Sequence, residues 1–301
     1  MNNNMNNKNN TNNKNNTNNN YHKFFITNKS ITYKTKLNYL ITIPCVNREE
    51  RNAVNILDKT FNVFENACLF EDSEFYTLKI ILFESGSVDL SYLYCLNSYI
   101  EKYPGKIEIM FSKIKLNGVT NTFRMFQTIN SISQNGMGNT KIDFIMWMDD
   151  DILVCKNFMK NADTWIKNYA NYSLFSSLYV PYDTFFISGH KYVCQANLPG
   201  FYGTCCTIFK PQLAQFVIPY WFHEHFERFD YNPDTRFRDS LRKTFNMGKI
   251  LVSFPSLVEH LNIGSAILQN KLVNKGHKAK LFVGVDKDPE LYVKDTYQNL
   301  V

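Results

Sequence analysis

The strongest structural signal lies in Lys141-Ile-Asp-Phe-Ile-Met-Trp-Met-Asp149-Asp150-Asp151-Ile-Leu-Val-Cys155, where an apolar run meets three aspartates. The run from Phe144 to Met148 is too short for a helix and is bounded by polar residues, which is typical of a buried strand. Three adjacent carboxylates cannot stay in an apolar layer without partners or a metal. The strand therefore reaches the surface at its carboxyl end, which is the ligand-binding end of an open α/β sheet.

The three aspartates differ in the direction that their side chains take. In extended backbone, Asp149 and Asp151 point to one side and Asp150 points to the other. Two hard oxygen ligands on one side suit Mg²⁺ or Mn²⁺, with a substrate phosphate at the remaining positions. The alternative is an acidic loop that caps the next helix at its N-terminus. We favour the metal site, because acidic caps are common whereas an apolar strand that ends in Asp-x-Asp is not.

The segments around this strand alternate between strand-like and helix-like patterns. Short apolar runs indicate strands, and apolar residues at steps of three and four indicate helices. The alternation predicts an α/β fold, with a mixed, mostly parallel sheet flanked by helices. Pro44 is expected to end the first strand. The first half should hold strands at 39–43, 78–83, 107–111 and 144–148, and helices at 54–68, 90–102, 119–133 and 156–172.

The second half of the chain is less regular. Residues 184–198 fit either a hairpin or a mobile loop. Pro211 suits the first turn of a helix, in which a bend is expected at Pro219. The expected strands are 174–179, 204–209 and 249–254, and the expected helices are 211–222 and 234–246.

Composition excludes several classes of protein. The chain has 301 residues of which 44% are hydrophobic, enough for a sizeable globular core. The formal charge of +6 comes from lysines that precede Glu49, so no nucleic-acid partner is expected. No apolar run approaches the ~18–20 residues of a membrane helix, and no secretory signal is visible. We therefore expect a cytoplasmic protein without an integral membrane segment.

The cysteines do not form a recognisable pattern. There are seven, and no Cys-x-x-Cys pair occurs among them. A structural zinc site and a disulfide framework are therefore not indicated. We expect most of the cysteines to be small buried hydrophobic residues in a reducing compartment.

Asp239 is a candidate for proton transfer. It lies on the predicted helix 234–246 beside several cations, which would keep its carboxylate ionised. An ionised carboxylate that faces a cleft can accept a proton from a hydroxyl group. The alternative is a surface aspartate that pairs with Arg242 or Lys243, and spacing by itself favours this alternative.

Three further segments contain groups that can bind ligands. His260 follows a strand and is either a metal or phosphate ligand or an ordinary hydrogen-bonded polar residue. His223-Glu-His225 is a second possible metal site, although the His-Glu-x-x-His pattern of metalloproteases is absent. The glycines of Gly200-Phe-Tyr-Gly-Thr-Cys-Cys-Thr-Ile-Phe209 permit close approach to a ligand, or simply a tight turn.

Taken in order, these segments resemble the nucleotide-sugar-dependent glycosyltransferases of the GT-A fold. The resemblance covers about residues 37–268, and its C-terminal part is similar to the N-acetylglucosaminyltransferase IV group and related viral and microbial enzymes. It rests on Ile43-Pro-Cys-Val-Asn-Arg48, Met148-Asp-Asp-Asp151, Gly200 to Phe209, Asp239-Ser-Leu and Pro255-Ser-Leu-Val-Glu-His260.

The resemblance implies an activity and a domain organisation. The activity is inverting transfer of a hexose from a nucleotide-diphospho-sugar to a hydroxyl of a glycan or protein, with Mn²⁺ or Mg²⁺ as cofactor. Residues 37–301 would form a single GT-A-like catalytic domain, with a nucleotide-binding half at 37–155 and an acceptor-binding half at 156–301. Residues 1–36, which begin with an Asn-rich low-complexity tract, are expected to be disordered.

The resemblance also implies roles for individual residues. Asp149 and Asp151 would lie at the metal and the diphosphate, and His260 would complete the metal shell or contact the diphosphate. Asp239 would be the general base that activates the acceptor hydroxyl. The implied donor-binding residues are Arg48 and Glu84 in the nucleotide pocket, Arg124 at the diphosphate and Asp150 near the sugar or ribose.

Two other functions remain open at this point. A metal-dependent nucleotidyltransferase would also use paired aspartates and a metal on an α/β sheet. A non-catalytic carbohydrate- or nucleotide-binding module would bind similar ligands without turnover. Release of a nucleoside diphosphate, release of pyrophosphate, or binding without turnover distinguishes the three.

Overall fold

A computed structural model describes residues 36–47, 55–170, 173–184, 186–190, 192–197, 205–222, 232–245, 248–261 and 278–289. Several parts of the sequence analysis lie outside these ranges, among them nearly all of the Asn-rich segment 1–36, Arg48, and the segments 200–204 and 223–225.

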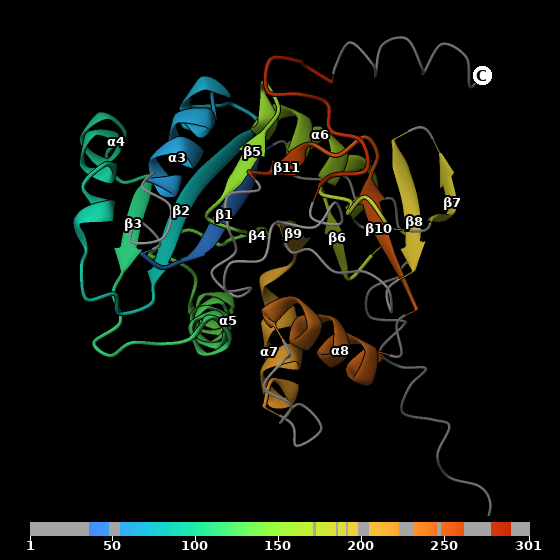
Figure 1. Cartoon of the computed structure of the whole chain (residues 1–301). Helices are drawn as coiled ribbons and strands as arrows, with labels where there is room; N and C mark the ends of the chain where they lie inside the picture. Colours follow the sequence, from blue (N-terminus) through green and yellow to red (C-terminus); the bar gives the residue numbers. More distant parts are fainter. Residues whose placement is uncertain are drawn as a thin grey trace, which may run out of the picture.

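Among the described residues, nine strands form one mixed sheet in the order β3-β2-β1-β4-β9-β6-β10-β8-β7 (Figure 1). Neighbours from β3 to β4 run parallel, whereas β9 lies antiparallel to both β4 and β6. Strands β7 and β8 form an antiparallel hairpin at one edge. The strands are β1 (Leu37–Cys45), β2 (Tyr76–Glu84), β3 (Ile107–Met110), β4 (Phe144–Met148), β6 (Phe175–Ser177), β7 (Phe186–His190), β8 (Val193–Asn197), β9 (Cys206–Phe209) and β10 (Lys249–Ser253).

Helices cover both faces of this sheet, with α3, α4 and α6 above it and α5, α7 and α8 below it in Figure 1. The predicted α/β fold with a mixed sheet between helices is confirmed. The helices are α3 (Ile56–Asn66), α4 (Leu96–Lys102), α5 (Gly118–Asn135), α6 (Phe158–Tyr169), α7 (Ala214–Val217) and α8 (Pro233–Phe245), with short 3₁₀ segments η1 (Ser91–Leu93), η4 (Pro211–Leu213) and η5 (Ile218–Tyr220).

The central strand β1 contributes to two hydrophobic cores. Tyr39, Ile41 and Ile43 pack with α3, α4 and α6, whereas Leu40 packs with the helices of the opposite face. Both faces of the strand are therefore buried, which explains its nearly continuous apolar sequence. The same reason applies to β4, all five residues of which are buried.

Aromatic rings hold α8 against the sheet beside β4. Phe237 of α8 stacks on Phe126 of α5 with ring centroids 5.5 Å apart, and it meets Trp147 of β4 edge-on, also at 5.5 Å. Such pairs add about 0.5–1.5 kcal/mol each to the free energy of burial. This packing places α8 on the face of the sheet that α5 and α7 also cover.

The structure corrects two local expectations and decides between two alternatives. Strand β1 continues through Pro44, which pairs with Phe83 of β2, because pairing with β4 ends at Thr42 and the missing N–H leaves no bond unmade there. The helix expected over 211–222 is α-helical only in α7 and ends before Pro219, whose nitrogen cannot donate to a preceding turn. Within the segment 184–198, β7 and β8 pair as a hairpin, one of the two expected alternatives.

Two features had no clear signal in the sequence. A small antiparallel sheet joins β5 (Ile152–Val154) to β11 (Val258–His260). Residues 278–289 return to the fold, where the N–H of Lys280 donates to the carbonyl of Val180 over 2.8 Å. Both depend on pairing between distant segments, which local periodicity does not report.

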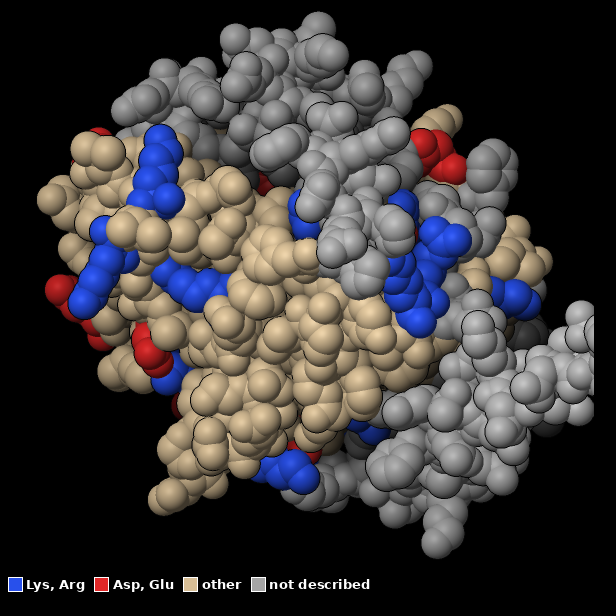
Figure 2. Space-filling model, turned by 90° about the horizontal axis from the view of Figure 1, so that it is seen from below, with Lys and Arg blue, Asp and Glu red and all other residues tan. Residues whose placement is uncertain are grey.

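Two observations bear on membrane and nucleic-acid partners. In the described part of the chain, no helix combines the length and apolar character that crossing a bilayer requires. Figure 2 shows the face seen from below Figure 1, where the basic side chains of the described residues stand in separate groups between uncharged surface. A face that binds nucleic acid typically carries a continuous basic stripe instead.

Candidate active site

The three aspartates form the link between β4 and β5, and two other elements fix its backbone. The hydroxyl of Thr60, on α3, donates to the carbonyl of Asp150 over 2.8 Å and accepts from the N–H of Ile152 at 3.3 Å. The N–H of Leu261, just after β11, donates to the carbonyl of Asp151 over 2.8 Å. The link is therefore held at both ends, and its side chains have defined directions.

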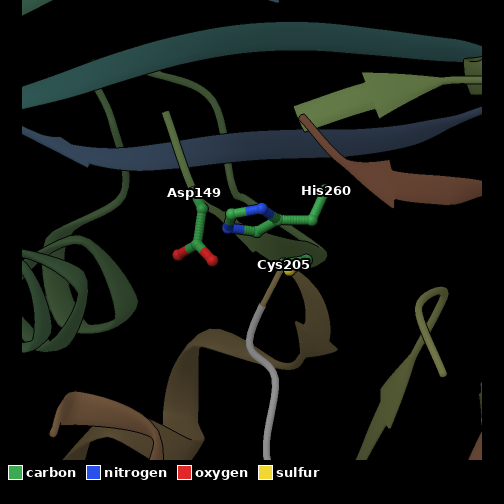
Figure 3. Close-up of side chains that lie close together, drawn as sticks. All are labelled: Asp149, Cys205 and His260. Atoms are coloured by element: carbon green, nitrogen blue, oxygen red, sulfur yellow. The ribbon is translucent and has the colours of Figure 1, made fainter. Parts of the chain in front are cut away.

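Strand pairing brings two further side chains to Asp149. In the β5–β11 pair His260 lies opposite Ile152, and in the β4–β9 pair Cys206 lies opposite Met148. Cys205 therefore comes next to Asp149 at the end of β4. Ligand atoms of Asp149, Cys205 and His260 all lie within 4.8 Å of one another. Figure 3 shows the three side chains converging, with the imidazole of His260 pointing toward Asp149.

Asp151 contacts the same imidazole. Its Oδ1 atom lies 3.3 Å from Nε2 of His260, and its side chain is only 3% exposed. Asp149 is half-buried, so it keeps part of its carboxylate at the surface. The structure thus brings together the three residues that the sequence analysis assigned to a metal.

Asp150 lies in a different environment. Its side chain is buried, and its charge reaches Tyr92, which follows β2. Burial, Cys45 and the charges of Glu84 and Asp150 together raise the pKa of Tyr92. Asp150 therefore belongs to the group around Glu84 and Tyr92, whereas Asp149 and Asp151 belong to the group around His260.

Cys205 carries the clearest electrostatic signature of the site. Burial raises the pKa of its thiol well above the ordinary value, and the charges of Asp149, Asp151 and Asp234 raise it further. The thiol also makes a hydrogen bond with Asp149. In the absence of a cation this cysteine is therefore protonated, and its S–H donates to the carboxylate.

Glu84 shapes the loop that follows β2. Its buried carboxylate accepts from the N–H of Gly86 at 2.7 Å and from the N–H of Ser87 at 2.9 Å. Gly86 has a φ of +81°, and a Cβ atom there would come within 2.1 Å of the carbonyl oxygen of Ile114. Glu84 therefore orders the backbone at the end of β2 through its side chain.

Arg124 joins the ends of β2 and β3. Its Nη2 donates to the carbonyl of Met110 over 2.6 Å and to that of Glu84 over 3.2 Å, and its guanidinium lies 5.6 Å from the ring centroid of Phe83. Its buried Nε has no hydrogen-bond partner among the described residues. Burial lowers the pKa of Arg124, and the charge of Glu84 opposes this shift. The Nε of Arg124 therefore remains as a hydrogen-bond donor at the carboxyl ends of the parallel strands.

Asp239 does not lie in the group around His260. Its Oδ1 is 3.0 Å from Nε of Arg238 and 3.5 Å from Nη1 of Arg242, the helix-surface pairing that spacing favoured. Asp234, in the first turn of the same helix, is the residue whose charge reaches Cys205. The role of Asp239 as general base therefore needs its ion pairs to open.

Sequence reasoning missed Cys205 and Asp234. The sequence analysis treats Cys205 as one of the buried hydrophobic cysteines. Its neighbours in space could not be foreseen, because they are set by the antiparallel pairing of β9 with β4. A signal was present, since Cys205 immediately precedes an apolar strand and follows a glycine-containing segment. Asp234 follows Pro233 at the start of a helix, a place where an acidic residue has a common structural role.

The architecture and the position of the site define a class of fold. A parallel β3-β2-β1-β4 half continues into antiparallel strands, and the polar residues gather where β4 ends. This is a GT-A-type α/β fold, and the solved structures with a similar fold include GT-A-type glycosyltransferases. No protein-family model and no curated protein matches the sequence.

Two solved structures illustrate the likeness. GalNAc-T7 with UDP, GalNAc and Mn²⁺ matches with a TM-score of 0.52 and 10% identity, over 78% of this chain and 45% of that chain. S. aureus TarS 1–349 in complex with UDP matches with a TM-score of 0.45 and 12% identity, over 73% of this chain and 58% of that chain. The chain thus spans about half of the length of these structures, and the likeness concerns the fold.

Proposed function

We propose that this chain is a metal-dependent glycosyltransferase that moves a hexose from a nucleotide-diphospho-sugar to an acceptor hydroxyl with inversion. The observation that carries the proposal is the convergence of Asp149 and His260, with ligand atoms within 4.8 Å, at the end of β4 in a GT-A-type fold. GalNAc-T7, which matches the fold, is described with UDP, GalNAc and Mn²⁺. The fold, together with these metal-binding side chains, supports a nucleotide-sugar as the donor substrate of this chain.

The metal-ligand atoms of this group fit a divalent cation. Asp149 and His260 offer an oxygen and a nitrogen, and Oδ1 of Asp151 lies 3.3 Å from Nε2 of the same imidazole. When bound, the cation would stabilise the negative charge that develops on the departing diphosphate. Imidazole suits divalent transition-metal ions, whereas Mg²⁺ prefers oxygen alone. A transition-metal ion is therefore a better fit to these residues than Mg²⁺.

Residues at the ends of β2 and β3 would hold the nucleotide. The free Nε of Arg124 supplies a charged donor suited to a phosphate oxygen. The carboxylate of Glu84 orders the loop after β2, next to Arg124. Asp150 belongs to the group around Glu84 and Tyr92. Arg48 lies outside the described residues, and its role in the nucleotide pocket rests on the resemblance.

The acceptor hydroxyl needs a base on the side opposite the leaving group. Asp239 is the residue that the resemblance assigns, and its contacts with Arg238 and Arg242 would have to open to admit an acceptor. Asp234, in the first turn of the same helix, is a second candidate. A glycan or protein hydroxyl is the acceptor that we propose.

The decisive experiment incubates the purified chain with uridine, guanosine and cytidine diphosphate sugars and Mn²⁺. Thermal shift identifies the donor that binds, and assays for nucleoside diphosphate and pyrophosphate identify the reaction. We expect Mn²⁺-dependent binding and release of a nucleoside diphosphate, both lost in Asp149→Asn. Pyrophosphate release from a nucleoside triphosphate would instead indicate a nucleotidyltransferase, and binding without turnover would indicate a non-catalytic module.

A further inference from the structure

The group around Asp149 contains a sulfur atom that the proposed oxygen and nitrogen ligands do not account for. The register of β9 on β4 places Cys205 beside the end of β4, and its thiol lies within 4.8 Å of the ligand atoms of both Asp149 and His260. The three side chains come from three separate segments of the chain and meet at one point (Figure 3).

The spacing is close to that of a metal centre. In a tetrahedral zinc site, ligand atoms at about 2.0–2.3 Å from the ion are roughly 3.5 Å from one another. The upper limit of 4.8 Å here means that movements on the order of 1 Å bring all three atoms to an ion. Rotation about side-chain bonds supplies movements of this size without a change in the backbone.

The neighbouring cysteine does not join this group. Cys206 is fully buried, and it is not part of the cluster that Asp149, Cys205 and His260 form. The distinction follows from strand geometry, because adjacent residues at the start of β9 point to different sides. Cys206 therefore serves as a matched control, because it is the next residue in the chain, carries the same thiol and is nearly as buried.

We infer that Cys205 is a ligand of the active-site cation, so that a carboxylate, an imidazole and a thiolate select Zn²⁺ or Co²⁺ over Mn²⁺ and exclude Mg²⁺. This inference rests on the cation site of the proposed function and specifies its chemistry. Thiolate ligands favour zinc and its neighbours in the first transition row, whereas Mg²⁺ requires oxygen. Three protein ligands leave at least one position for an oxygen of the donor diphosphate.

Binding exchanges a proton for the cation. The S–H bond of Cys205 breaks, the sulfur forms a bond with the metal, and the proton leaves to solvent, so that one proton is released for each ion bound. A cysteine that only fills space would make no such exchange.

Cobalt absorption tests the inference on the full chain after removal of metals with a chelator. A Co²⁺–thiolate bond gives a charge-transfer band in the near ultraviolet that oxygen and nitrogen ligands do not give. We expect this band in the wild-type protein and in Cys206→Ser, its loss in Cys205→Ser, and its disappearance when Zn²⁺ is added. Competition with a chromophoric chelator should show Zn²⁺ affinity reduced at least ~100-fold in Cys205→Ser, more than second-shell changes usually cost.

A second measurement needs no variant. X-ray absorption of the wild-type protein loaded with one Zn²⁺ should show a sulfur neighbour at about 2.3 Å. Cobalt that binds without the band, or a zinc shell of oxygen and nitrogen alone, would overturn the assignment of Cys205. In that case loss of Mn²⁺-dependent nucleotide binding in Asp149→Asn would still support the proposed function, so the two failures are distinguishable.

Discussion

Asp151 and His260 lie 3.3 Å apart, between Oδ1 and Nε2, although one follows β4 and the other ends β11. The contact depends on the small β5–β11 sheet, in which Ile152 lies opposite His260. Through it, the aspartate loop and a segment near the C-terminal end of the described fold become parts of one site. The carboxylate also restricts the orientation of the imidazole.

The first prediction concerns this orientation. Asp151→Asn keeps the shape of the side chain and removes its charge, so the imidazole of His260 loses the partner that holds its ring. Partners of metal-binding histidines typically contribute 10–100-fold to affinity. We expect cation affinity to fall by about that factor, as measured by competition with a chromophoric chelator.

A control separates this effect from unfolding. Asp163→Asn also removes a buried carboxylate, one that pairs with Lys167 and accepts from the hydroxyl of Tyr39, near the amino end of β1. It should lower stability without changing cation affinity. Unchanged affinity in Asp151→Asn would show that the contact with His260 has no part in cation binding.

The second prediction concerns the loop after β2. An alanine at Gly86 meets both a left-handed backbone, with a φ of +81°, and the carbonyl oxygen of Ile114 at 2.1 Å. The backbone conformation alone costs about 1–2 kcal/mol, and relief of the clash adds to this. Gly86→Ala should lower the free energy of unfolding by more than about 2 kcal/mol in urea titrations, and it should weaken nucleotide binding.

Gly105 provides the matched comparison. Its φ of +76° is nearly the same, but nothing lies within 4 Å of the position that a Cβ atom would occupy. Gly105→Ala should therefore show the backbone cost alone, about 1–2 kcal/mol. Equal destabilisation by the two substitutions would mean that the close approach to Ile114 is not what the loop requires.

The third prediction concerns Thr60. Its hydroxyl is fully buried and bridges the carbonyl of Asp150 and the N–H of Ile152. Thr60→Val keeps the shape and leaves both backbone groups without this partner, which costs about 1–3 kcal/mol. We expect that loss in chemical denaturation together with weaker cation binding, because the aspartate loop is no longer held.

An exposed threonine calibrates this result. Thr164 on α6 donates to the carbonyl of Lys160 at the surface, where water replaces the lost bond. Thr164→Val should change the free energy of unfolding by less than about 0.5 kcal/mol and leave cation binding intact. A similarly small effect for Thr60→Val would contradict a role for Thr60 in ordering the loop.

The fourth prediction distinguishes the two candidate bases. A general base contributes roughly 10²–10⁴-fold to the rate, so its loss should stop transfer while nucleotide binding persists. If Asp239 is the base, Asp239→Asn shows this split and Asp234→Asn does not. Initial rates of nucleoside diphosphate release, measured beside donor affinity for each variant, decide between them.

An arginine variant controls for the ion pairs of Asp239. Arg242→Gln removes one partner, whose Nη1 lies 3.5 Å from the carboxylate, and keeps the aspartate. Transfer should survive in this variant if the carboxylate itself accepts the proton. Parallel losses in Arg242→Gln and Asp239→Asn would assign the pair a structural role and leave Asp234 as the base.

Several expectations followed from local sequence and are confirmed. The apolar run from Phe144 to Met148 is strand β4 with the predicted bounds, because five consecutive apolar residues between polar ones suit a strand buried on both faces. Helix α5 extends the predicted helix by a few residues, since Asn117 caps its first turn by accepting from the N–H of Thr120. These features depend on residues close together in the chain.

Other features could not be predicted, and they share one cause. Pro44 was expected to end β1, but the absence of a β4 partner beyond Thr42 permits a proline there. Cys205 gave no local sign of its neighbours, because the pairing of β9 with β4 joins segments that are far apart in sequence. Local periodicity reports which face of an element is apolar and contains no information about which strand lies beside it.

The order of residues was therefore sufficient to establish an α/β fold, a polar site at the end of β4, and opposite directions for Asp150 and its two neighbours, because each depends on burial and alternation along one segment. The meeting of Asp149, Cys205 and His260 was decided by tertiary structure alone. Two separate strand pairings, β4 with β9 and β5 with β11, have to be satisfied together before their ligand atoms come within reach of one ion. Each pairing depends on the packing of the whole sheet between its two cores.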